Sequence, residues 1–167
     1  MSEQRLTQYL TDLVAINSVN PNLSEEGQGE RKIAEYIHAH FQKLGFNTDL
    51  FEVVNDRCNT TSFLAGKDSN KIILMNGHID TVGVEGMDSP FVLRQEGDRL
   101  FGRGTYDMLA GCAIQMCLAD FFAKNESPIS LAFTFVCDEE DKSIGMDHLM
   151  ANSLPTLKTK PILGIFM

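Results

Sequence analysis

Two largely apolar runs with a long apolar segment between them constrain this chain more than any other feature of its sequence. The first run, residues 72–75, is unbroken, and the second, residues 129–136, is apolar except at Ser130 and Thr134. The segment between them, residues 108–122, is apolar nearly all round. An unbroken apolar run suits a central strand covered on both faces, and a segment that is apolar all round is typical of a helix packed deep against a sheet. The order strand, helix, strand predicts an α/β fold: a mostly parallel or mixed sheet with helices on both faces.

The rest of the chain predicts further helices and strands around this centre. Leucine and valine recur at helical spacing over residues 2–16, and a second apolar stripe from Ile33 to Leu44 ends at Gly45, a residue suited to a helix C-terminus. Other predicted elements are strands over residues 46–54, 60–65 and 161–166, a turn over 66–70, a hairpin around 96–98, and a short helix over 144–150.

Charge and composition narrow the possible partners. With 167 residues the chain fits one domain, and its net charge of -9 reflects 14 Lys and Arg against 23 Asp and Glu. No basic cluster is longer than Arg31-Lys32, which argues against a nucleic-acid partner. The polar N-terminus lacks the apolar core of a secretory signal, and no run approaches the roughly 18 apolar residues of a membrane span. The sequence therefore predicts a cytoplasmic protein without a membrane partner.

Three short polar motifs lie at the ends of the apolar elements. Residues 76–81 follow the first apolar run, residues 102–107 precede the apolar helix, and residues 138–140 follow the second run. In open α/β sheets, ligands bind outside the carboxyl ends of the strands. Asp107 would stand before a helix N-terminus, where the helix dipole favours an anion. The topology therefore predicts that the three motifs meet.

The residue types in these motifs are those that hold zinc and similar divalent metals. Imidazole nitrogen and carboxylate oxygen are the expected ligands, and an aspartate can bridge two ions; His78, Asp107 and Glu140 supply that set. On an extended segment residues 78 and 80 point the same way, so Asp80 can accept the other ring N–H of His78. Glu139 and Glu140 point in different directions, so one can hold a metal while its neighbour transfers protons.

Each motif also has a simpler explanation. His78 and Asp80 can be an ordinary hydrogen-bonded pair, Asp107 can be a helix N-cap, and residues 138–141 can be a solvated acidic turn. The Gly-x-Gly pair before Asp107 can be a tight turn, because Asp107 itself occupies the place of the third glycine of a dinucleotide-binding loop. A calcium loop fails because Lys142 stands where an oxygen ligand belongs. The simpler explanations are strong one by one and weak together.

Together the motifs resemble those of the M20 family of metallopeptidases, the group of acetylornithine deacetylase, succinyl-diaminopimelate desuccinylase, aminoacylase and carboxypeptidase G. Residues 13–21 resemble the family's opening helix and loop, and residues 76–82, 102–108 and 138–140 resemble its three signatures in order. The resemblance implies a zinc-exopeptidase-like catalytic domain that hydrolyses an amide bond in an N-acyl amino acid or small peptide. A homodimer of the full-length protein is a further expectation.

The resemblance also implies a role for each site residue. His78 is the implied ligand of one zinc, Asp107 bridges two zinc ions, and Glu140 binds the other. Glu139 is the implied general base, and Asp80 orients His78. Zinc is the implied metal, with cobalt or manganese as possible replacements.

The chain departs from the family's pattern in two respects. Leu109-Ala110 stands where relatives commonly carry Lys-Gly. A further carboxylate ligand and a last histidine are expected after a later strand, and residues 161–167 resemble that strand cut off before its ligand. We therefore expect residues 1–167 to be the N-terminal part of a truncated catalytic domain, without the lid or dimerisation domain and the C-terminal part, and inactive as a fragment. The alternative is a non-catalytic binding or regulatory domain derived from the same fold.

Overall fold

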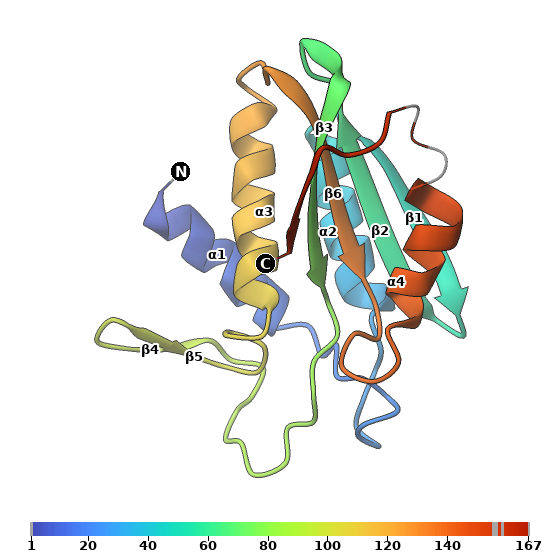
Figure 1. The fold of residues 1–167 in the computed structure, drawn as a ribbon. Helices are drawn as coiled ribbons and strands as arrows, with labels where there is room; N and C mark the ends of the chain where they lie inside the picture. The colour runs from blue at the N-terminus through green and yellow to red at the C-terminus, as the bar shows by residue number, and fades with distance from the viewer. Residues whose placement is uncertain (1, 155–156, 158, 167) are drawn as a thin grey trace.

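The computed structural model describes residues 2–154, 157 and 159–166, and it contains a five-stranded sheet with helices on both faces (Figure 1). The strands of this sheet are β1 (Asn47–Val54), β2 (Arg57–Leu64), β3 (Asp68–His78), β6 (Ile129–Val136) and β7 (Leu163–Phe166). The helices are α1 (Glu3–Val14), α2 (Arg31–Lys43), α3 (Leu109–Phe122), α4 (Ile144–His148) and the π-helical segment η1 (Leu149–Ser153). A separate hairpin consists of β4 (Arg94–Glu96) and β5 (Arg99–Phe101).

The sheet order β1-β2-β6-β3-β7 places the two apolar runs side by side. β3 is parallel to both β6 and β7, whereas β1 is antiparallel to β2 and β2 is antiparallel to β6. The crossover from β3 to β6 contains α3, and the predicted mixed α/β fold is confirmed. Because β3 and β6 are parallel and His78 lies opposite Val136, both strands end at the same edge of the sheet.

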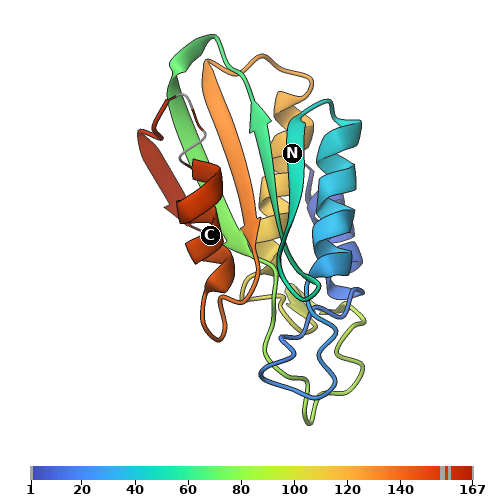
Figure 2. The ribbon, with the colours of Figure 1, turned by 90° about the vertical axis from the view of Figure 1, so that its right-hand side faces the viewer.

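Two layers of helices cover the sheet. Figure 2 shows α1, α2 and α3 on one face and α4 with η1 on the other. The core under the first layer contains a group of buried aromatic rings: Phe41, Phe46, Phe133 and Phe135. Because strand side chains alternate between faces, a smaller buried cluster forms on the opposite side: Ile72, Leu74 and Ala132. The two clusters cover β3 and β6 on both faces, as their largely apolar sequences predict.

Phe41 is completely buried, and its ring centroid lies 5.1 Å from that of Phe133 and 5.2 Å from that of Phe46. Replacement of Phe41 by alanine is expected to lower the free energy of unfolding by about 3–5 kcal/mol, because it leaves a cavity in a packed core. Urea denaturation measures the change. Phe121 is 48% exposed, so Phe121→Ala should cost about 1 kcal/mol or less. Equal losses in the two variants would contradict this description of the core.

The strand boundaries differ from the prediction at two places. β2 begins earlier than expected, and β3 includes part of the predicted turn at one end and the first residues of the first motif at the other. The motif belongs to the strand because it continues the parallel pairing with β6 up to His78. The hydroxyl of Thr134 donates a hydrogen bond of 2.7 Å to Asn76 Oδ1. The polar end of β3 therefore finds its hydrogen-bond partner inside the sheet. A search for apolar runs in the sequence does not detect such a strand end.

The other predicted elements are present near their expected positions. The hairpin around residues 96–98 is β4–β5, the helix over 144–150 is α4 continuing into η1, and β7 lies within the segment 161–166. Met167, the end of the segment that resembled a later strand, lies outside the described residues. Among the helices of the described residues, none combines the length and the apolar character that crossing a membrane requires.

Candidate metal centre

His78 is the last residue of β3, and packing against the start of α3 positions it. Its backbone N–H lies 3.0 Å from Met108 Sδ, and its carbonyl oxygen accepts a hydrogen bond from Cys112 Sγ at 3.2 Å. Strand and helix approach closely at Gly77, where a Cβ would lie 3.0 Å from Met108 Cε. Since Asp107 immediately precedes Met108, this packing brings Asp107 to the end of β3.

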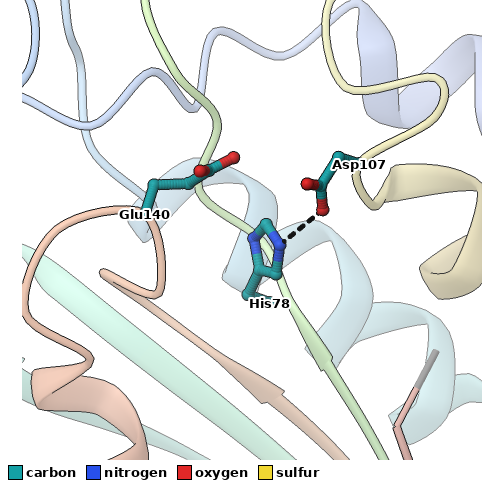
Figure 3. A group of neighbouring side chains, drawn as sticks. All are labelled: His78, Asp107 and Glu140. Carbon is teal, nitrogen blue, oxygen red and sulfur yellow. Dashed lines mark hydrogen bonds and ion pairs between the residues drawn. The ribbon is translucent and has the colours of Figure 1, made fainter.

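Three predicted ligands lie together at this edge of the sheet (Figure 3). His78 Nε2 lies 2.9 Å from Asp107 Oδ1, and Glu140 comes from the turn that follows β6. One candidate ligand atom of each of the three residues lies within 4.8 Å of the other two. His78 is buried, Glu140 is half-buried and Asp107 is exposed, so the group is open to solvent on one side.

Asp80 is completely buried and connects His78 to the acidic turn at residues 138–140. His78 Nδ1 lies 3.1 Å from the backbone carbonyl oxygen of Asp80 and 3.4 Å from its Oδ1. The two carboxylate oxygens of Asp80 accept the backbone N–H groups of Glu139 and Glu140, at 2.9 and 3.1 Å. The spacing in the sequence indicated the contact with His78. It did not indicate the contacts with the turn, which join residues that are far apart in the chain.

Glu139 lies beside the three candidate ligands. Its Oε2 is 3.6 Å from His78 Nε2, and its side chain is 52% exposed. Both glutamates of the motif therefore reach the cluster, and Glu139 does so from a position that solvent water can enter. All five residues predicted for the site lie within this one region.

The charges of the site strongly affect one another. Burial lowers the pKa of His78, but its contacts with Asp80, Asp107 and Glu139 outweigh burial and raise the pKa to about 9. Burial raises the pKa of Asp80, but the hydrogen bonds it accepts, first from His78, bring the pKa below its usual range. The pKa of Glu140 is raised by burial and, against the attraction of His78, by the neighbouring carboxylates. This crowding of carboxylates favours a bound cation.

The donor set fits a divalent metal such as zinc. One imidazole nitrogen and two carboxylates are ligands that zinc takes, and one candidate ligand atom of each residue lies within 4.8 Å of the other two. The contact of His78 Nδ1 with Asp80 is the kind of second hydrogen bond that fixes the tautomer of a metal-ligating histidine. With its proton kept on Nδ1, a neutral His78 would offer the lone pair of Nε2 to a metal in the cluster. The described residues therefore form a possible metal site.

A second buried polar group lies beside the site, and the sequence did not predict it. Asp138 is completely buried and pairs with Arg57, which also forms a bidentate ion pair with the buried Glu30. Asn20 donates hydrogen bonds to both Asp80 and Asp138. These residues come from separate segments, so no motif joins them. The one available signal was that Asn20 lies in the segment that resembles the opening loop of the M20 family.

Known proteins resemble this chain over the region that contains the site. Residues 74–166 match the sequence profile of peptidase family M20/M25/M40. A probable succinyl-diaminopimelate desuccinylase of Staphylococcus aureus (strain MRSA252) is 28% identical over 132 residues, which cover 76% of this chain and 30% of that protein. An acetylornithine deacetylase of Vibrio parahaemolyticus is 28% identical over 146 residues, which cover 84% of this chain and 38% of that protein.

A solved structure shows the same fold. Human carnosine dipeptidase 1 superposes with a TM-score of 0.84 at 17% sequence identity, over 98% of this chain and 38% of that one. At this identity the likeness concerns the fold alone. The family match extends over β3, the crossover, β6 and β7, and so includes every predicted site residue. The chain spans about a third of the length of the curated relatives named above.

Proposed function

Because the chain belongs to peptidase family M20/M25/M40, we propose that it is the N-terminal part of the catalytic domain of a zinc-dependent hydrolase. The bond cleaved is an amide bond in an N-acyl amino acid or a small peptide. The observation that carries the proposal is the convergence of His78, Asp107 and Glu140, with Glu139 beside them, at one edge of the sheet. The names of the relatives support deacetylase and desuccinylase activities as the first to test.

The proposed role of each residue is the one that the resemblance to the M20 family implies, and the contacts at the site support it. His78 would be a ligand of one zinc ion through Nε2, Glu140 would be a ligand of a second, and Asp107 would be a ligand of both; cobalt or manganese are alternatives to zinc. Asp80 orients His78 by its contacts with Nδ1. We further propose that the remaining metal ligands, and the residues that recognise the substrate, lie outside residues 1–167, and that this part alone does not turn over substrate.

The chemistry of the chain's own residues can then be stated. Bound zinc would supply a lowered pKa for water and would polarise the substrate carbonyl. Glu139 takes the proton of the attacking water and passes it to the leaving nitrogen. Its half-exposed carboxylate lies 3.6 Å from His78 Nε2, beside the candidate ligands, which supports this role. Asp80 keeps the lone pair of Nε2 available by holding the proton of His78 on Nδ1.

Metal removal tests the proposed function on the complete protein. We expect the purified protein to contain zinc and to hydrolyse at least one member of a panel of N-acetyl and N-succinyl amino acids and dipeptides. A chelator should abolish the activity, and added zinc should restore it, because the carboxylates and His78 hold the metal reversibly. Absence of bound zinc together with absence of chelator-sensitive hydrolysis would contradict the proposal and favour a non-catalytic binding domain.

A further inference from the structure

The acidic turn that carries Glu139 and Glu140 begins at a residue with an unusual backbone conformation. Asp138 has a φ of 63°, in the left-handed region, and its side chain is completely buried. Aspartate is one of the few residues other than glycine that adopt this conformation, and it persists where surrounding contacts hold it. The direction in which the two glutamates leave β6 therefore depends on what holds Asp138.

Asp138 is held both at its backbone and at its carboxylate. Its N–H donates to Glu30 Oε1 at 3.1 Å, and its Oδ1 accepts hydrogen bonds from Arg57 Nη2 and Asn20 Nδ2, each at 2.9 Å. Glu30 and Arg57 are paired with each other, so one connected cluster holds Asp138. Removal of Arg57 would leave two buried carboxylates without their cation, which makes Arg57 a poor probe of this cluster.

Asn20 connects that cluster to the metal site. The same Nδ2 atom that donates to Asp138 also donates to Asp80 Oδ2 at 2.9 Å. Asp80 in turn accepts the backbone N–H groups of Glu139 and Glu140. The amide nitrogen of Asn20 therefore connects Asp138, which begins the turn, to Asp80, which accepts the two backbone N–H groups that follow in the turn.

The amide of Asn20 is itself fixed in one orientation. Asn20 is completely buried, its backbone N–H donates to the carbonyl oxygen of Thr81 at 2.8 Å, and its Oδ1 accepts the N–H of Asn22 at 3.0 Å. With the oxygen used in this way, the nitrogen faces the two carboxylates. An amide nitrogen has two N–H groups and no charge, so it satisfies both carboxylates without adding a buried ion.

We propose that Asn20 is a positioning residue for the metal site: by joining Asp80 to Asp138, its amide sets the positions of Glu139 and Glu140 relative to His78. The proposal rests on the function proposed above for the two glutamates. Without the amide, the two carboxylates lose their shared donor and repel each other, so Asp80 and the turn that it holds shift relative to Asp138. Metal binding by Glu140 and proton transfer by Glu139 then weaken together.

Asn20→Asp keeps the shape of the side chain and the acceptor oxygen for Asn22 but replaces the shared donor by a third carboxylate, so Asn20→Ala, which adds no buried charge, is measured beside it. In the complete protein we expect kcat to fall about 10- to 100-fold while KM changes by less than about threefold. Zinc affinity, measured by competition with a chelator, should fall over the same range. The matched control is Asn22→Asp in the same loop, since Asn22 Nδ2 donates to Asp141 Oδ2 at 2.9 Å in an exposed pair. Solvent weakens that pair, so kcat and zinc affinity should stay within about twofold.

These measurements distinguish a positioning role of Asn20 from a contribution to stability alone. A lower melting temperature with unchanged kcat and zinc affinity would show that Asn20 contributes stability alone and would overturn the proposal. Equal losses in Asn20→Asp and Asn22→Asp would overturn it as well. If Asn20→Asp does not fold, Asn20→Ala removes the donor without adding a charge and is judged by the same measurements. Failure of the proposed function is recognised separately, because the wild-type protein would then show neither bound zinc nor hydrolysis.

Discussion

Replacement of Glu139 by glutamine in the complete protein is expected to lower kcat by about 10²- to 10⁴-fold, the range that general acid–base catalysis contributes. An amide of the same shape neither takes a proton from the attacking water nor returns one to the leaving nitrogen. Zinc content should stay near that of the wild type, because the proposed ligands are His78, Asp107 and Glu140. Steady-state kinetics and metal analysis of the same preparations measure the two effects.

A matched glutamate far from the site serves as the control for that variant. Glu126 is exposed, and its Oε2 pairs with Lys67 Nζ at 3.0 Å on the surface. Glu126→Gln is expected to leave kcat within about twofold of the wild type, since exposed pairs of this kind contribute little. If the Glu139 variant instead loses as much zinc as a ligand variant, Glu139 is a ligand and the assignment of the general base is wrong.

The second large effect is expected for His78→Ala. This substitution removes the only nitrogen among the three candidate ligands and also the ring that contacts Asp80. Loss of a residue that only hydrogen-bonds to a metal ligand can lower metal affinity by roughly 100-fold. Loss of the ligand His78 itself should lower zinc affinity by more than that. Competition with a chelator of known affinity measures the change, and hydrolysis at a fixed zinc concentration should fall with it.

His38 is the natural control for this substitution. It lies in α2, and its Nδ1 is 3.2 Å from Thr48 Oγ1, so it belongs to the contact between helix and sheet and not to the site. His38→Ala is expected to change zinc affinity by less than about twofold, although it removes the same side chain. Zinc affinity that is unaffected by His78→Ala would exclude His78 as a ligand.

The elements that carry the site were predictable because each has a local signature. The apolar segment over residues 108–122 and the run over 129–136 correspond closely to α3 and β6. Such patterns show which faces a segment must bury, whatever the rest of the chain does. The end of β3 was not predicted, because it lacks such an apolar pattern. Asn76 is polar, and only its contact with Thr134 shows that it belongs in a strand.

The candidate ligands were also accessible to sequence reasoning, because parallel strands bring their carboxyl ends to one edge. In the structure His78 lies opposite Val136, so β3 and β6 do end at the same edge. The buried cluster of Glu30, Arg57 and Asp138 was not accessible in this way. Each of these residues, taken alone in the sequence, fits an ordinary surface position, since charged residues are seldom fully buried.

The sequence by itself determined the kinds of residue available to this protein, the order of its strands and helices, and the ligand types that point to a divalent metal. Only the tertiary structure decided which atoms meet. Asn20 and Asp138 are separated by 118 positions in the chain, yet a hydrogen bond of 2.9 Å joins them. A hydrogen bond acts only over about 3 Å, so its partners are chosen by how helices and strands pack. Sequence spacing carries no information on that choice beyond a few neighbouring residues.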